Sequence, residues 1–168
     1  MTGLERNADV VHLTAYAPLM AHEEGWQWAP DLIWFNNLEA YGTPNYYIQK
    51  LFSNNAGTDL LNITENGKPL IGQNELYVSA VKDENTNELI IKAVNTSTVN
   101  KTVIVAPKGG GFIGKGTIMK LSHLDLTTIN SFESPNNIGV STSNFVIIDG
   151  EIQIELVAQS LNVIKLKI

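Results

Sequence analysis

The chain has 168 residues, of which 43% are hydrophobic, and it carries a formal net charge of −6 and no cysteine. This composition supports a packed core, and the length suits one domain or one domain with part of another. The net negative charge argues against a basic surface that would bind nucleic acid or an anionic membrane. The absence of cysteine excludes disulfides, thiolate nucleophiles and Cys-ligated zinc. No apolar run is long enough for a transmembrane helix.

The first part of the chain predicts a helix followed by strands. Apolar residues at a spacing of three and four predict a helix from Leu4 to about Ala15, which Pro18 ends or kinks. Two later segments are candidate strands. One is Tyr16 to Met20, and the other is the continuous apolar run Leu32 to Phe35, which is typical of a strand buried on both faces.

A second helix is predicted to begin at Pro44. Thr43 supplies a hydroxyl N-cap, and proline is favoured at the first helical position. The apolar stripe of this helix consists of Tyr47, Ile48, Leu51 and Phe52. Asn and Gly between residues 53 and 57 are helix-stop signals. We therefore place a domain boundary between residues 1–57 and residues 58–168.

Residues 58–168 predict an antiparallel β-sandwich, because short strands alternate with frequent turns. The candidate strands are Leu76 to Val81, Leu89 to Val94, Thr102 to Ala106, Thr117 to Leu124, Phe145 to Asp149, Ile152 to Leu156 and Asn162 to Ile168. Asp83 to Asn87 and Asp149-Gly150 are hairpin signals. A glycine-rich run at residues 109–116 contains GxGxxG but precedes a strand. We interpret it as a loop, because a phosphate site needs a following helix.

Aromatic residues are concentrated near the N-terminus. All three Trp residues lie between positions 26 and 34, and nine of the thirteen aromatics precede residue 57. Composition alone favours a buried aromatic core. Rings close to Asn, Gln, Asp and Glu also suit a sugar-binding surface, where ring faces stack on sugar C–H groups and polar groups bind hydroxyls.

The order of residues in this region resembles a known family. The matching segments are Ala17-Pro18-Leu19, Trp28-Ala29-Pro30-Asp31-Leu32-Ile33-Trp34-Phe35, Tyr41-Gly42-Thr43-Pro44-Asn45-Tyr46-Tyr47-Ile48-Gln49, Asn130-Ser131-Phe132-Glu133-Ser134-Pro135-Asn136-Asn137-Ile138 and the closing strand Leu156 to Ile168. Together they resemble the C-terminal end of α-L-arabinofuranosidases of glycoside hydrolase family 51.

This resemblance implies a mainly β fold. An antiparallel, jelly-roll-like sandwich would follow a helix–strand–helix remnant of a (β/α)8 barrel, in residues 1–57. The parent enzyme would release terminal α-L-arabinofuranosyl residues from arabinan or arabinoxylan by a retaining mechanism without a cofactor. The alternative is a free-standing, non-catalytic β-sandwich module that binds carbohydrate or protein.

Glycoside hydrolysis needs a pair of carboxyl groups, about 5–5.5 Å apart in retaining enzymes. Glu23 and Glu24 are sequence neighbours and would diverge, and the family's catalytic glutamates match no position here. We therefore assign no catalytic residue, and HExxH is absent, so we assign no metal ligand.

The resemblance implies that the segment after the last barrel strand walls the sugar pocket. If Tyr16 to Met20 is that strand, which we favour, His22 to Pro30 faces the substrate, with Trp26 and Trp28 on either side of Gln27 as stacking platforms. Asp31 and Glu39 are candidates for contacts with sugar hydroxyls. If Leu32 to Phe35 is that strand, Asn36, Asn37 and Glu39 face it instead. Either Trp could alternatively pack against the sandwich.

Partners and compartment follow from the same interpretation. We expect an arabinose-containing polysaccharide or oligosaccharide as substrate of the intact enzyme, with no nucleic acid or membrane partner. The apolar stripe of the second helix lacks barrel neighbours, so either the chain's own sandwich or a second copy has to cover it. We favour the second copy, because a two-fold contact covers the same patch on both chains, and this predicts a homo-oligomer. For the parent enzyme we favour a periplasmic or extracellular location over a cytoplasmic one.

Overall fold

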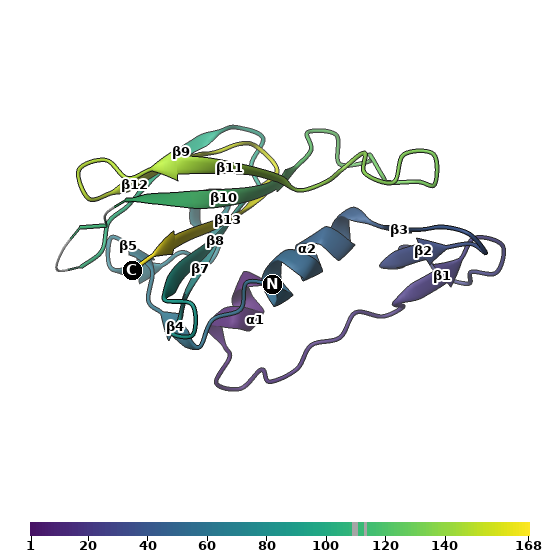
Figure 1. Cartoon of the computed structure of the whole chain (residues 1–168), viewed down its shortest axis with the longest axis horizontal. Coiled ribbons are helices and arrows are strands. Elements are labelled where there is room, and N and C mark those ends of the chain that lie inside the picture. The colour runs from purple at the N-terminus through teal and green to yellow at the C-terminus, as the bar shows by residue number, and fades with distance from the viewer. Residues whose placement is uncertain (109–110, 113) are drawn as a thin grey trace.

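The largest element is a six-stranded antiparallel sheet with the strand order β11-β10-β13-β8-β7-β4 (Figure 1). A computed structural model describes residues 1–108, 111–112 and 114–168, so part of the glycine-rich run lies outside the described residues. The strands are β4 (Asp59–Leu61), β7 (Leu76–Asp83), β8 (Glu88–Asn95), β10 (Lys115–Ser122), β11 (Ser141–Val146) and β13 (Ser160–Lys167).

A two-stranded sheet of β9 (Lys101–Val105) and β12 (Ile152–Leu156) covers one face of the large sheet. The alternation of β12 explains this packing, since Ile152, Ile154 and Leu156 are buried whereas the residues between them are exposed. The buried side chains of this core are Leu76, Val78, Ala80, Leu89, Ile91, Ala93, Ile152, Ile154, Leu156, Ile164 and Leu166. The predicted antiparallel sandwich is confirmed.

Both predicted hairpin turns form. Asp83 pairs with Glu88 across the β7–β8 turn, and Asn87 adopts a φ of 54° there. Asp149 and Gly150 have φ values of 52° and 78°, as a two-residue hairpin requires. Besides the short strands β3 (Ala40–Gly42) and β4, the sequence did not predict a hairpin of β5 (Thr64–Glu65) and β6 (Lys68–Pro69) or the 3-10 helix η1 (Gln73–Glu75).

Helix α2 (Pro44–Ser53) packs on the opposite face of the large sheet. Leu51 and Phe52 are buried there, with Tyr47 and Ile48 packed against the same cluster. The sheet contributes Val81, Ile90, Leu121, Leu161 and Val163 to this second core. Of the two covers considered for the stripe of this helix, the sandwich of the same chain is the one that the structure shows.

The helix predicted from Leu4 to Ala15 is much shorter, since α1 spans Thr2–Arg6 only. Asn7 ends it, and its side-chain amide donates a hydrogen bond to the Gly3 carbonyl over 2.7 Å. The predicted apolar face is not buried, since Leu4 is 40% exposed and Ala8 and Ala15 are exposed as well. Without tertiary packing, a short helix is marginal in water. The segment from α1 to β1 consequently runs past α2 without regular structure (Figure 1).

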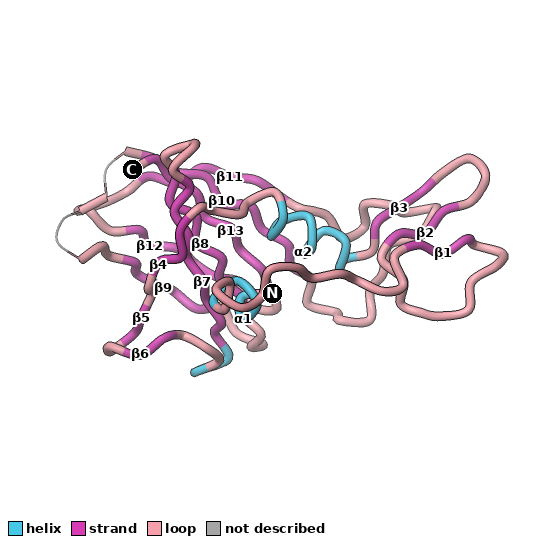
Figure 2. Tube along the Cα trace, turned by 90° about the horizontal axis from the view of Figure 1, so that it is seen from below, coloured by secondary structure: helices cyan, strands magenta, loops and turns pink. Residues whose placement is uncertain are grey.

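A three-stranded sheet lies at the far end of α2 from the sandwich (Figure 2). It consists of β1 (Met20–His22), β2 (Ile33–Phe35) and β3 (Ala40–Gly42). β1 pairs parallel to β2, and β3 pairs antiparallel to β2. The strand expected at Tyr16 to Met20 is therefore wrong in position, because pairing begins at Met20. In the described part of the chain, no helix has the length and apolarity to cross a bilayer.

Candidate functional site

The parallel pairing of β1 and β2 brings the ends of both strands to one edge. The rings of His22 and Phe35 meet edge to face, with centroids 5.2 Å apart. The backbone N–H of Glu23 donates to the Phe35 carbonyl over 2.9 Å. The Asn36 side-chain amide donates to the Glu23 carboxylate over 3.3 Å. The two strand ends that the sequence offered as alternatives therefore lie side by side.

A cavity of about 240 Å3 lies beside this edge, between β1 and the turn that follows it. Four of the five predicted substrate-contact residues line it: Trp26, Gln27, Trp28 and Asp31. Asn36 does not line it and is held by Glu23 instead. The cavity is built almost entirely from one stretch of chain, between Pro18 and Asp31.

The two tryptophans of the cavity are exposed, Trp26 by 51% and Trp28 by 68%. Trp26 contacts the half-buried Trp34 edge to face, with ring centroids 5.6 Å apart. Neither Trp26 nor Trp28 belongs to the buried clusters of the sandwich. Both rings are thus available to stack on a ligand or on another part of a larger protein.

Asp31 is buried, and one of its carboxylate oxygens accepts no hydrogen bond from the described residues. Its side chain is 2% exposed, and its Oδ2 has no hydrogen-bond partner among the residues that the structure describes. A buried carboxylate oxygen without a donor is costly, by roughly 1–3 kcal/mol or more. The position therefore suits a hydroxyl or N–H donor brought by a ligand or by another segment. Asp31 is also the one carboxylate among the described residues that line the cavity.

The loop between β10 and β11 holds the three-stranded sheet against the sandwich. Asn130 is buried, and its amide donates to the carbonyls of Gly42 over 2.9 Å and of Ile138 over 3.0 Å. Its Oδ1 accepts from the backbone N–H of Ile138 over 2.7 Å. The family resemblance included this loop, but the sequence did not predict that the loop anchors the three-stranded sheet.

Aromatic packing adds to this connection. Tyr41 of β3 meets Phe132 of the loop edge to face, with centroids 4.9 Å apart. Burial raises the pKa of Tyr41, and the negative charges of Glu23 and Glu133 raise it further. The Tyr47 hydroxyl donates to Oδ1 of Asn136 over 2.9 Å. The β10–β11 loop thus contacts both β3 of the three-stranded sheet and helix α2.

The family of α-L-arabinofuranosidase C-terminal domains matches residues 1–160. Alpha-L-arabinofuranosidase 2 of Arabidopsis thaliana is 33% identical over 140 residues, which cover 82% of this chain and 20% of the relative. The extracellular exo-alpha-L-arabinofuranosidase of Streptomyces chartreusis is 63% identical over 57 residues, 34% of this chain and 7% of its own length. The chain therefore spans a minor part of these relatives.

Solved structures agree with this match. The arabinose-bound α-L-arabinofuranosidase MgGH51 superposes with a TM-score of 0.85 at 27% identity, over 98% of this chain and 26% of that one. The α-L-arabinofuranosidase of Thermotoga maritima has the same fold, with a TM-score of 0.78 at 21% identity over 97% of this chain and 35% of its own. The chain belongs to the family of α-L-arabinofuranosidase C-terminal domains found in glycoside hydrolase family 51.

Proposed function

We propose that the chain is the C-terminal part of a retaining α-L-arabinofuranosidase, and that its cavity forms one wall of the sugar site. The observation that carries the proposal is the grouping of Trp26, Gln27, Trp28 and Asp31 around a single cavity, where Asp31 also has a buried carboxylate oxygen without a hydrogen-bond partner among the described residues. Aromatic rings can stack on the C–H face of a sugar, and the carboxylate and amide beside them can bind its hydroxyls.

Within this proposal the roles of the side chains differ. Trp26 and Trp28 provide apolar faces for sugar C–H groups, whereas Gln27 and Asp31 bind hydroxyls. Because Asp31 has a buried and unpaired oxygen, it gains most from a donated hydroxyl hydrogen bond. Asn36 fixes Glu23 at the strand edge and so acts on the site indirectly.

The proposal assigns no acid/base or nucleophile to this chain. Asp31 is the one carboxylate lining the cavity among the described residues, and retaining hydrolysis needs two. Residues 1–57 would belong to the catalytic barrel and residues 58–168 to the sandwich, with the reacting carboxylates supplied by the rest of a longer protein. The 168-residue chain alone should therefore leave a chromogenic α-L-arabinofuranoside intact. Turnover that survives stringent purification would contradict this assignment.

The test is Trp28→Ala in the intact enzyme, with Leu124→Ala as the control. Leu124 is also a large exposed side chain, but it lies on the loop after β10 and outside the cavity. Loss of one stacking ring should lower kcat/KM about five- to 150-fold, which corresponds to about 1–3 kcal/mol per ring. The Leu124 variant should keep its activity. Unchanged kinetics for Trp28→Ala, together with a large loss of stability, would favour a packing role.

A further inference from the structure

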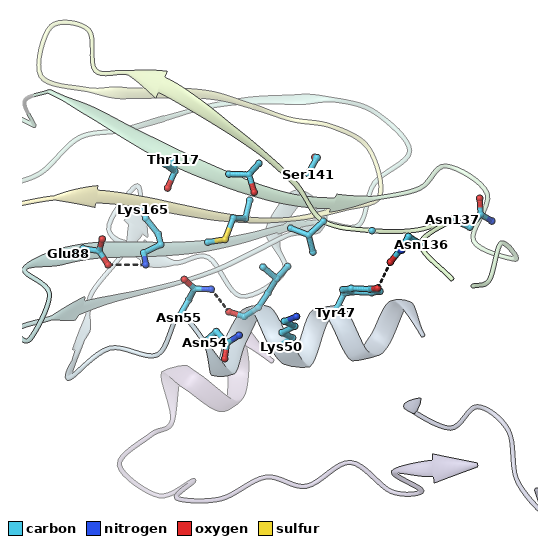
Figure 3. Close-up of a pocket in the computed structure, with 15 residues that line it drawn as sticks. Tyr47, Lys50, Asn54, Asn55, Glu88, Thr117, Asn136, Asn137, Ser141 and Lys165 are labelled. Atoms are coloured by element: carbon cyan, nitrogen blue, oxygen red, sulfur yellow. Dashed lines mark hydrogen bonds and ion pairs between the residues drawn. The ribbon is translucent and has the colours of Figure 1, made fainter. Parts of the chain in front are cut away.

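A second and larger hollow lies on the sandwich, away from the cavity described above. This groove of about 880 Å3 runs between α2 and the outer face of β10, β11 and β13 (Figure 3). It shares no lining residue with the tryptophan cavity. Its size falls in the range of roughly 300–1,000 Å3 that is usual for small-molecule sites.

Strand alternation and helix position together form the groove. Thr117, Met119 and Thr142 project from β10 and β11 on the side that faces α2. Tyr47 of α2 and Asn54, the residue that follows the helix, line the opposite wall (Figure 3). The helix covers the sheet around Ile90 and Val163, and the groove lies where this cover ends.

The neutral polar side chains that line the groove differ in whether they have a hydrogen-bond partner in the protein. Tyr47, Asn55 and Ser141 make hydrogen bonds with neighbouring residues. The side chains of Asn54, Thr117 and Thr142 make none with the described residues, although they line the same hollow. An amide and two hydroxyls offer both donors and acceptors, as sugar hydroxyls do.

The charges at the groove do not select a charged ligand. The Lys165 ammonium forms an ion pair with Glu88 over 2.9 Å, so the two charges compensate. The Lys50 ammonium lies 5.8 Å from the centroid of the Tyr46 ring. No cluster of like charge therefore faces the groove in the described part of the chain.

We propose that this groove is an accessory binding site for a neutral oligosaccharide, with Tyr47 as its aromatic contact and Asn54, Thr117 and Thr142 as its hydroxyl-binding groups. The inference rests on the proposed function, because a domain of a polysaccharide-degrading enzyme meets such chains. An accessory site would hold the polymer near the catalytic cleft and raise its effective concentration there.

The test is a titration of the isotope-labelled 168-residue chain with arabinopentaose and with xylopentaose, followed by NMR. Backbone amide signals of residues around the groove should shift, especially those of α2 and β10. Thr142→Arg places a bulky side chain in the groove and should weaken binding about ten-fold or more. Ser143→Arg is the matched control, because the neighbouring residue on β11 is equally exposed and points to the opposite face. It should bind as the unmodified chain does.

Trp28→Ala separates this inference from the proposed function. If the groove binds, this variant keeps the affinity of the unmodified chain. Binding that is lost in Trp28→Ala and kept in Thr142→Arg would assign the sugar to the tryptophan cavity and overturn the accessory site. A chain that binds neither pentasaccharide at millimolar concentration, or that binds an oligogalacturonide in their place, would also overturn it.

Discussion

Glu5 and Lys92 form an ion pair that attaches the first helix to the sandwich, and the two ends of the pair should respond unequally to mutation. Lys92 lies on β8 with its side chain fully buried, and its ammonium contacts the Glu5 carboxylate. The side chain of Glu5 is 15% exposed. Ser79 also donates to Glu5 over 2.5 Å, and the Phe52 ring centroid lies 5.4 Å from the Lys92 ammonium.

Glu5→Gln removes the counter-charge of an ammonium that has no access to water. Breaking a buried pair in this way typically costs about 3–5 kcal/mol of unfolding free energy. We expect about 3 kcal/mol, because Lys92 can also lose its proton and so limit the penalty. Lys92→Met leaves Glu5 near the surface, where water and the Ser79 hydroxyl still donate hydrogen bonds to its carboxylate. This change should cost about 1 kcal/mol or less, since the methionine chain also fills the space.

The double variant Glu5→Leu with Lys92→Met should be close to the unmodified chain in stability, because an apolar pair avoids the desolvation of both charges. Urea denaturation of the four proteins of the cycle Glu5→Leu, Lys92→Met gives the coupling energy from the midpoints, provided that the slopes agree. Glu5→Gln is compared separately with the unmodified chain. A coupling energy near zero, or a larger loss for Lys92→Met than for Glu5→Gln, would refute the reasoning and mean that α1 is not docked in solution.

Three further outcomes are expected. Asn130→Ala should lower the unfolding free energy by about 2–3 kcal/mol, because two carbonyls and one N–H lose a buried partner; a loss below about 0.5 kcal/mol in thermal or urea unfolding would contradict the anchoring role. Burial lowers the pKa of Lys92 below its usual value of 10.5, although Glu5 opposes this shift. At a pH just below 10.5 the unfolded chain therefore binds more protons than the folded chain does. The stability of the unmodified chain relative to Lys92→Met should therefore rise with pH there, and a falling difference would contradict the assignment. Deletion of residues 1–57 should expose the sheet face under α2 and yield aggregates in light scattering, so a stable monomer of residues 58–168 would show that the sandwich needs no such cover.

The sequence predicts best where burial follows strand alternation. The limits of β12 are those expected from Ile152, Ile154 and Leu156. β11 begins four residues before the expected Phe145, because Ser141 to Asn144 form an exposed edge strand without an apolar face. The short edge strand β4 was missed for the same reason, since it gives little periodic signal.

The site was predictable only in part. Trp26, Gln27, Trp28 and Asp31 followed from a sequence resemblance, and their convergence on one cavity required the structure. Asn130 bonds to Gly42, 88 positions away, and no local pattern reports a contact of that separation. The amphipathic stripe of α2 indicates that a partner exists without saying which surface provides it, so the sequence left the sandwich and a second copy as alternatives.

The boundary near residue 57 marks a change in amino-acid composition, and the hydrophobic packing continues across it. Leu51 and Phe52 lie before it, yet they complete a core with Ile90 and Val163 of the sandwich. Asn130 lies after it and holds β3, the strand that leads into α2. A displacement of the sandwich would therefore reach the tryptophan cavity through the helix and the β10–β11 loop together. The contacts of Asn130 with Gly42 and of α2 with the sandwich thus connect the three-stranded sheet to the core of the sandwich.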